Sequence, residues 1–171
     1  MNNEAVGRFN GRIIQAGAEQ ASLPDGSSMT IDMVRHPGAA AVLVLDERNR
    51  VCMLRQYRPA LADWLWEIPA GKLDHGEAPA LAAQRELAEE TGLRARDWQP
   101  LGSVATAPGF CDEIIHLYLA RELETGTRNL EQHEILEVHW RPLAEMLQWA
   151  DSGRITDAKT LAALLRVRAL A

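Results

Sequence analysis

The sequence contains little that ties a protein to a membrane or to an oxidising compartment. It has no apolar run of the roughly 18–20 residues needed to span a bilayer. Its first ten residues, MNNEAVGRFN, lack the basic stretch and the apolar core of a signal peptide. The two cysteines, Cys52 and Cys111, form no CxxC pair and have no metal-like spacing, so we expect two free thiols. The simplest location for such a chain is the cytoplasm.

The chain is also short of positive charge. Its 18 Lys and Arg residues face 24 Asp and Glu residues, which gives a formal net charge of −6 at pH 7. The sequence offers no basic stripe to neutralise the phosphates of a nucleic-acid polymer, so we expect neither DNA nor RNA as a partner. A small phosphate-containing substrate is compatible with this charge, because divalent cations held by acidic side chains reverse the local electrostatic field.

The length and the hydrophobic pattern predict one domain of mixed α/β type. The chain has 171 residues, of which 47% are hydrophobic and 25% are charged, an ordinary composition for a globular domain. Strands are expected at 12–20, 29–35, 39–45, 51–57, 64–68, 98–106, 114–120 and 135–140. Helices are expected at 79–92, 142–151 and 156–170. This order predicts a mixed α+β sheet with helices on its faces.

The segment at residues 71–93, GKLDHGEAPALAAQRELAEETGL, carries the strongest chemical signal. A proline at its expected helix start and a glycine at the expected end predict a helix of about three turns. Glu86, Glu89 and Glu90 fall at positions i, i+3 and i+4, so their carboxylates share one helix face. Like charges at this spacing destabilise an isolated helix by roughly 0.2–0.5 kcal/mol per pair. Hard oxygen ligands gathered in this way suit Mg²⁺ or Mn²⁺.

The same segment resembles the Nudix box, which joins a glycine, a glutamate, an Arg-Glu pair, a Glu-Glu pair and a closing glycine at fixed spacings. The chain matches every specified position of this motif: Gly71, Glu77, Arg85, Glu86, Leu87, Glu89, Glu90, Gly92 and Leu93. By this resemblance the chain is identified as a Nudix hydrolase, a family that cleaves nucleoside diphosphates linked to another group. The implied fold is an α/β/α sandwich. The resemblance also implies that residues 1–36 form an N-terminal β extension to a Nudix domain at 37–171, and that the extension packs in a homodimer.

The resemblance assigns roles within the motif. It implies metal binding by the backbone carbonyl of Ala70 and the carboxylates of Glu86, Glu89 and Glu90, with Glu86 and Glu90 also counted as catalytic. It implies a structural role for Gly71, Glu77, Arg85 and Gly92. Physical reasons accompany two of these roles. Glycine lets a loop bring a carbonyl close to an ion, and Arg85 stands four residues before Glu89, where the two can pair along the helix.

A loop downstream of the box, SVATAPGFCDEII, is similar to the corresponding segment of ADP-ribose pyrophosphatases. In that branch the loop glutamate, here Glu113, positions or deprotonates the attacking water, or reaches a metal through water. These alternatives stay open at the level of sequence. In some relatives the general base comes from a later loop, which makes Glu134 a reserve candidate.

Three arginines are candidates for substrate phosphates, because a guanidinium grips phosphate oxygens bidentately. Arg55 is preferred over Arg58, and alternation along a strand would point the two to opposite faces. Arg35, at the end of an earlier strand, is a third candidate. The stretches RQYRPALADWLWEIPAGKLD and RITDAKTLAALL also resemble the ADP-ribose branch, and the second is given no chemical role.

The resulting hypothesis is a Mg²⁺-dependent enzyme, in which Mn²⁺ can substitute, that cleaves the nucleotide sugar ADP-ribose to AMP and ribose 5-phosphate. The box indicates the chemistry but not the substrate. Other hydrolase activities, on GDP-mannose, NADH or a dinucleoside polyphosphate, remain alternatives. So does a module that senses a nucleotide without cleaving it, although a complete carboxylate cluster argues against this.

Overall fold

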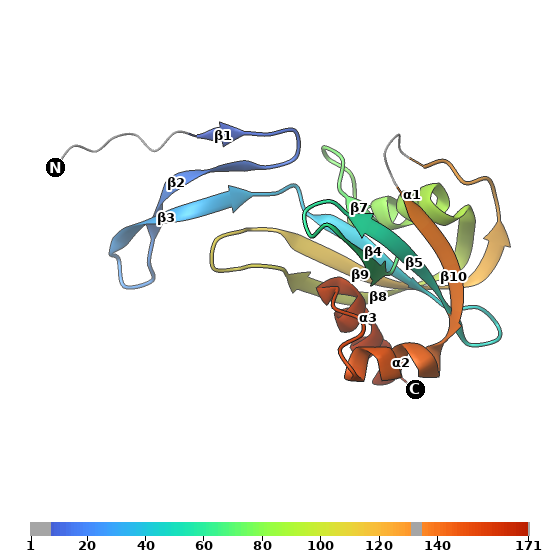
Figure 1. Cartoon of the computed structure of the whole chain (residues 1–171). Helices are drawn as coiled ribbons and strands as arrows, with labels where there is room; N and C mark the ends of the chain where they lie inside the picture. The colour runs from blue at the N-terminus through green and yellow to red at the C-terminus, as the bar shows by residue number, and fades with distance from the viewer. Residues whose placement is uncertain (1–7, 131–134, 171) are drawn as a thin grey trace.

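The structure is a computed structural model that describes residues 8–130 and 135–170. Figure 1 shows its elements in chain order. The strands are β1 (Phe9–Asn10), β2 (Gln15–Ser22), β3 (Ser28–Arg35), β4 (Ala39–Val44), β5 (Arg50–Arg58), β6 (Asp63–Glu67), β7 (Ala70–Lys72), β8 (Leu93–Ala105), β9 (Ile114–Thr125) and β10 (Leu136–Pro142). The helices are α1 (Pro79–Thr91), α2 (Leu143–Asp151) and α3 (Ala158–Arg168).

The strand β4 lies inside a four-stranded sheet with the order β7-β4-β9-β8. It pairs antiparallel with β7 and parallel with β9, so the sheet is mixed, as the order of elements predicts. Every residue of β4, AAAVLV, is buried. Continuous apolar sequence of this kind is expected where a strand is covered on both faces.

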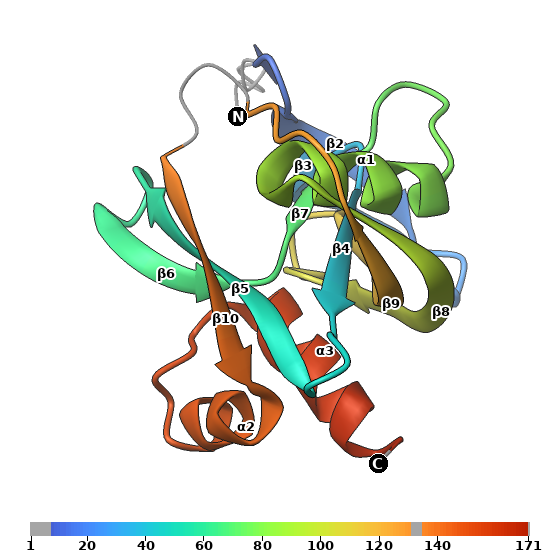
Figure 2. The same ribbon diagram turned by 90° about the vertical axis from the view of Figure 1, so that its right-hand side faces the viewer.

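The side chains of β4 alternate between two helical layers. Ala41 and Leu43 belong to the hydrophobic cluster that contains Leu164 of α3. Val42, between them, belongs to the cluster that contains Leu87 of α1. Figure 2 shows α1 and α3 on opposite sides of the sheet. The α/β/α sandwich implied by the Nudix resemblance is thereby confirmed.

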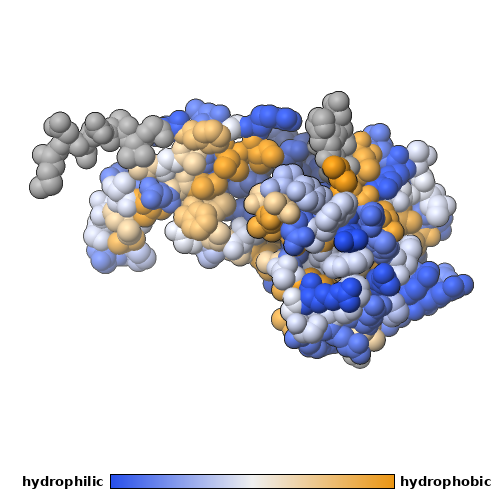
Figure 3. Space-filling model, viewed as in Figure 1, coloured by the Kyte–Doolittle hydropathy of each residue, from blue (hydrophilic) through white to orange (hydrophobic). Residues whose placement is uncertain are grey.

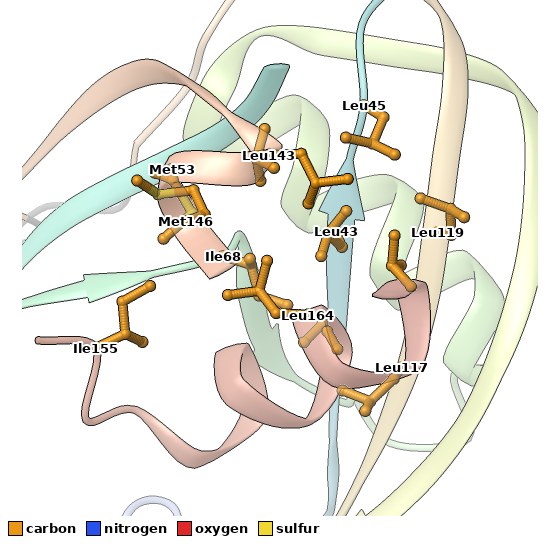
Figure 4. Packing of buried hydrophobic residues seen from close by; sticks show 14 of the residues in the cluster. Leu43, Leu45, Met53, Ile68, Leu117, Leu119, Leu143, Met146, Ile155 and Leu164 are labelled. Carbon is orange, nitrogen blue, oxygen red and sulfur yellow. The ribbon is translucent and has the colours of Figure 1, made fainter. Parts of the chain in front are cut away.

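A second sheet, with the antiparallel order β10-β5-β6, packs beside the first. The core between them contains Met53 from β5 and Ile68, which follows β6, together with Leu143 and Met146 from α2. Figure 4 shows these side chains converging with those of the central sheet and α3. Ile68 is also bound to the start of α3, because its backbone N–H donates to the side chain of Thr160 at 2.9 Å.

The N-terminal strands form a third sheet, β1-β2-β3, which extends to one side of the helices in Figure 1. Large apolar side chains are exposed on and around it, among them Phe9, Ile13, Met29 and Phe110. They belong to the apolar surface visible over this region in Figure 3. A surface of this kind is characteristic of protein–protein contact sites.

The predicted elements are present with shifted ends. β8 begins at Leu93, directly after the helix cap, rather than at residue 98. α3 begins at Ala158 rather than at residue 156, because the side chain of Asp157 accepts a hydrogen bond from the backbone of Thr160 and caps the helix there. β1 and β7 are not predicted, since runs of two and three residues carry no usable periodicity. Within the described ranges, no helix is long and apolar enough to cross a membrane.

Candidate active site

The helix α1 presents the three carboxylates that the sequence places on one face. Gly92 caps its C-terminus in the left-handed region at φ 73°, with its N–H donating to the carbonyl of Ala88. Glu86 and Glu90 are buried, with 8% and 1% of their surface exposed, and Glu89 is partly exposed. Glu90 is thus part of the contact between α1 and the sheet, where it accepts a hydrogen bond from β7.

The short strand β7 brings backbone up to these carboxylates. The N–H of Ala70 donates to Oε2 of Glu90 at 2.9 Å. A Cβ atom placed on Gly71 would lie 1.8 Å from Oε1 of Glu86, far inside any real contact distance. Glycine is therefore required at position 71 by the approach of Glu86 rather than by an unusual backbone angle.

Arg85 connects the loop before α1 to the carboxylates on it. Its Nε and Nη2 donate to the two carboxylate oxygens of Glu77, each at 3.0 Å. Its Nη1 donates to Glu86 at 2.6 Å and to Glu89 at 3.0 Å, and Nη2 also reaches the carbonyl of Lys72 at 3.1 Å. The hydrogen bond from Arg85 lowers the pKa of Glu77, while the same bond raises the pKa of Arg85. This geometry supports the structural role expected of Arg85 and Glu77, and the pairing of Arg85 with Glu89.

Glu86 borders a pocket of about 320 Å³, together with Ala70 and Gly71 of β7. Its wall brings opposite charges together: the acids Glu86 and Glu113 and the bases Arg58, Lys72 and Lys159. Such a pocket can hold a metal ion on its acidic side and phosphate oxygens on its basic side. The charge distribution suits an anhydride of phosphoric acid, whose cleavage needs both a metal ion and cationic side chains on the phosphate oxygens.

The donor chemistry of the helix fits a hard divalent cation. Glu86, Glu89 and Glu90 supply carboxylate oxygens, which Mg²⁺ and Mn²⁺ prefer. In the described part of the chain, no three His, Cys, Asp or Glu side chains are already gathered around one point. Hydrogen bonds from Arg85 and Ala70 hold the three carboxylates in their present positions. Glu86 lies in the pocket wall, so this helix offers a carboxylate oxygen to the pocket in which a hard cation would fit.

Glu113 lies in the pocket wall on the loop between β8 and β9, and the end of β3 holds this loop. The backbone N–H of His36 donates to Oδ1 of Asp112 at 2.8 Å, and the side chain of Arg35 donates to Oδ2 at 2.9 Å. The hydrogen bond from Arg35 lowers the pKa of Asp112. Nδ1 of His36 is 3.3 Å from Glu113 itself. The N-terminal segment thus positions the candidate base, a contact that the sequence did not predict.

The three candidate arginines lie in different surroundings. Arg35 is engaged by the carboxylates of Glu19 and Asp112. The two arginines of β5 point to opposite faces, as alternation predicts, but Arg58 rather than the preferred Arg55 lines the pocket. Arg55 is exposed and stacks over the ring of Trp64 with 5.3 Å between guanidinium carbon and ring centroid.

Two charged residues of the site carry no role in the sequence-based hypothesis. Glu67, at the end of β6, is bound by Arg58, and Lys159 of α3 also contacts it. A glutamate inside an apolar strand, WLWEI, and a lysine two residues after a helix cap are the signals that could have indicated a buried pair. Glu134, the reserve candidate for the base, lies outside the described residues.

Comparison with known proteins places these features in a family. The NUDIX domain model matches residues 34–164. The chain is 42% identical over 158 residues to a methanol dehydrogenase activator from Bacillus methanolicus, covering 91% of this chain and 85% of that protein. It is 40% identical over 158 residues to an ADP-ribose pyrophosphatase from Bacillus subtilis strain 168, with the same coverage of 91% and 85%.

A solved structure supports the same fold. The crystal structure of an ADP compounds hydrolase superposes with a TM-score of 0.78 at 21% identity, covering 99% of this chain and 96% of that one. Members of the family generally need divalent metal ions, in keeping with the carboxylates of α1. The match spans most of the chain and includes the full motif on α1, so the chain belongs to the NUDIX domain family and is a Nudix pyrophosphohydrolase.

Proposed function

We propose that this chain hydrolyses the pyrophosphate bond of ADP-ribose, giving AMP and ribose 5-phosphate. The observation that carries the chemistry is the pocket in which Glu86 and Glu113 face Arg58 and Lys159. The choice of substrate is supported by the 40% identity to the ADP-ribose pyrophosphatase of Bacillus subtilis.

We assign the metal to Glu86, Glu89, Glu90 and the carbonyl of Ala70, with Mg²⁺ as the natural ion and Mn²⁺ as a substitute. When bound, the ion lowers the pKa of a coordinated water and neutralises charge on the phosphate oxygens. The side chains of the protein keep the proposed ligands in position. Arg85 and Glu77 hold the start of α1 so that the carboxylates keep their spacing.

Glu113 is our candidate for the group that positions the attacking water or takes its proton. Its carboxylate lies in the pocket wall, and the bonds that Arg35 and His36 make to the neighbouring Asp112 hold its loop. The proton lost by the water would move to the carboxylate as the new oxygen–phosphorus bond forms and the bridging bond breaks. Glu134 remains the reserve candidate for this role.

We assign a substrate phosphate to Arg58, because its guanidinium lies in the pocket. Arg55 and Arg35 remain proposed contacts for parts of the substrate that extend beyond it. The exposed position of Arg55 over Trp64 would suit such a contact, whereas Arg35 would first have to leave Glu19 or Asp112.

The test is hydrolysis of ADP-ribose with and without Mg²⁺ in ¹⁸O-labelled water, with products read by mass spectrometry. Label in AMP or in ribose 5-phosphate identifies the phosphorus that water attacks. GDP-mannose, NADH and a dinucleoside polyphosphate at equal concentration are the comparison substrates. A clear preference for one of these would replace ADP-ribose, and tight binding of ADP-ribose without any product would indicate a sensor.

We further propose that residues 1–36 form a β extension to a Nudix domain at 37–171, and that the extension joins two copies in a homodimer. The exposed apolar side chains of Phe9, Ile13 and Met29 support this. A cytoplasmic location agrees with the free state of both cysteines. Light scattering at micromolar concentration should give twice the chain mass, and a monomer would refute the dimer.

A further inference from the structure

A buried carboxylate, Glu67, connects the pocket wall to the C-terminal helix. Only 1% of its surface is exposed. Nε of Arg58 donates to Oε1 at 2.7 Å and Nη2 donates to Oε2 at 2.6 Å, while Nζ of Lys159 donates to Oε2 at 2.5 Å. Burial acts to raise the pKa of Glu67, but the hydrogen bond from Arg58 and the charges of Lys159 and Arg58 lower it overall. The carboxylate is thus an anion held between two cations.

Lys159 is held in place as firmly as Glu67. It is 8% exposed, and its Nζ also donates to Oδ1 of Asp157, the cap of α3, at 2.9 Å. The next residue, Thr160, accepts a hydrogen bond from the backbone N–H of Ile68 at 2.9 Å. The first turn of α3 therefore contacts both Glu67 and the residue that follows it, so Lys159 has a fixed position relative to β6.

The contact between Arg58 and Glu67 leaves a defined edge of the guanidinium toward the pocket. The bonds to Glu67 use Nε and one hydrogen of Nη2, so Nη1 and the second hydrogen of Nη2 can donate to an anion. The side chain of Arg58 is 38% exposed and lines the pocket together with Lys159. A guanidinium paired one-to-one with a carboxylate is neutral as a unit, and its attraction for phosphate is weakened. Lys159 is a second cation on the same carboxylate and shares its charge, while Asp157 shares the charge of Lys159, so the neutralisation of Arg58 is reduced.

We propose that Lys159 is a positioning residue for the phosphate-binding guanidinium of Arg58 and that it acts through Glu67. Lys159 takes up part of the charge of Glu67, so Arg58 keeps both a fixed orientation and a positive potential toward the pocket. The inference rests on the proposed function, since it assumes that Arg58 meets a phosphate of the substrate. It gives the start of α3 a role in orienting Arg58, in addition to the place of Lys159 in the pocket wall.

The first test is Lys159→Met, which keeps the aliphatic length and removes the charge. Hydrogen bonds to charged groups contribute enough to change affinity by about tenfold or more. We expect KM for ADP-ribose to rise about tenfold, with kcat within about threefold of wild type, because the effect is on binding of the phosphate. Calorimetry with inorganic pyrophosphate should show the same loss, about tenfold in Kd.

A double variant separates positioning from a merely structural role. In Glu67→Gln/Lys159→Met the buried negative charge is gone, while the amide oxygen can still accept a hydrogen bond from Arg58. We expect KM and the pyrophosphate Kd to return most of the way to wild type. This variant removes the buried charge of Glu67 together with that of Lys159, and Asp157 keeps its hydrogen bonds from Thr160, so it keeps the proposal testable if the single variant does not fold.

The matched control is Arg166→Met on the same helix. Arg166 ties α3 to β8 by donating to the carbonyls of Leu101 at 2.5 Å and Ser103 at 3.0 Å, away from the pocket lining. Losing this cation should lower the melting temperature and leave KM unchanged. A similar rise in KM in this control would mean that any weakening of the attachment of α3 raises KM, which would refute a specific role of Lys159.

The outcomes distinguish the inference from the proposed function. If wild type does not cleave ADP-ribose but Lys159→Met weakens pyrophosphate binding, the substrate proposal fails and the role of Lys159 stands. If wild type cleaves ADP-ribose and Lys159→Met leaves both KM and pyrophosphate affinity unchanged, the role of Lys159 is wrong. A double variant that binds more weakly than the single variant would also overturn it.

Discussion

Replacement of Gly71 by alanine should disable the enzyme while leaving it folded. The added Cβ would lie 1.8 Å from Oε1 and 2.0 Å from Cδ of Glu86. Real Cβ contacts essentially never fall below 3.0 Å, so the carboxylate oxygen must retreat by at least 1.2 Å. A side-chain end can make this movement, and the backbone of β7 need not. Misplacement of a reacting group by about 1 Å can cost about 100-fold in rate, so we expect a comparable loss of kcat/KM for Gly71→Ala.

The assay compares Mg²⁺-dependent hydrolysis of ADP-ribose with thermal unfolding of the same samples. Gly26→Ala is the control, because Gly26 has a φ of 84° in the β2–β3 turn and no atom within 4 Å of an added Cβ. That change should lower stability by about 1 kcal/mol through backbone strain and spare activity. In a Glu86→Asp background the alanine at position 71 should have less effect, since the shorter side chain leaves room. Full activity of Gly71→Ala would refute the reasoning.

Three further predictions concern the carboxylates. Glu90→Gln should reduce turnover by several orders of magnitude with little change in the circular dichroism spectrum, because the amide can still accept the bond from Ala70; near-normal turnover would contradict the metal assignment. Glu113→Gln should lower turnover at unchanged Mg²⁺ affinity, measured by metal titration; a loss that saturating Mg²⁺ restores would make Glu113 a metal ligand instead. The lowered pKa of Glu67 adds stability that is present above its ordinary value of 4.5 and is lost as the pH falls through the folded value. Melting temperatures from neutral to acid pH should therefore fall less steeply in Glu67→Gln/Lys159→Met than in wild type. If the melting temperatures of the two proteins fell in parallel with pH, protonation of Glu67 would not contribute to the acid sensitivity of the fold.

The helix α1 could be predicted from the sequence because its information is local. A proline, a capping glycine and three glutamates within one stretch determine both the helix and the face that carries the acids. The contacts of Gly71 and Arg85 with this helix have a similarly local origin, although the expectation for Gly71 is the approach of a carbonyl to an ion, and the structure shows the approach of the Glu86 carboxylate. Their contacts with Glu86 and Glu77 span short distances along the chain.

The basic side of the pocket could not be predicted in the same way. Alternation along β5 correctly separates Arg55 from Arg58, but the face that meets the pocket depends on packing of β5 with β6 and α3. Glu67 and Lys159 are 92 residues apart in the sequence, and no local pattern joins them. The contact of His36 with the loop of Glu113 is similarly remote, since it depends on how β3 leaves the N-terminal sheet.

The pairing of Glu67 with Lys159 also bears on how the chain is made. Synthesis delivers β6 long before α3, so a nascent chain holds the carboxylate of Glu67 beside Arg58 without its second cation. Excluding water from the carboxylate of Glu67 is unfavourable until α3 docks and brings Lys159. Contacts between residues so far apart in the sequence also form slowly. A chain that ends early, with every metal ligand present but α3 missing, would stay partly open. Such products would be exposed to proteases, because their unfolded population is higher.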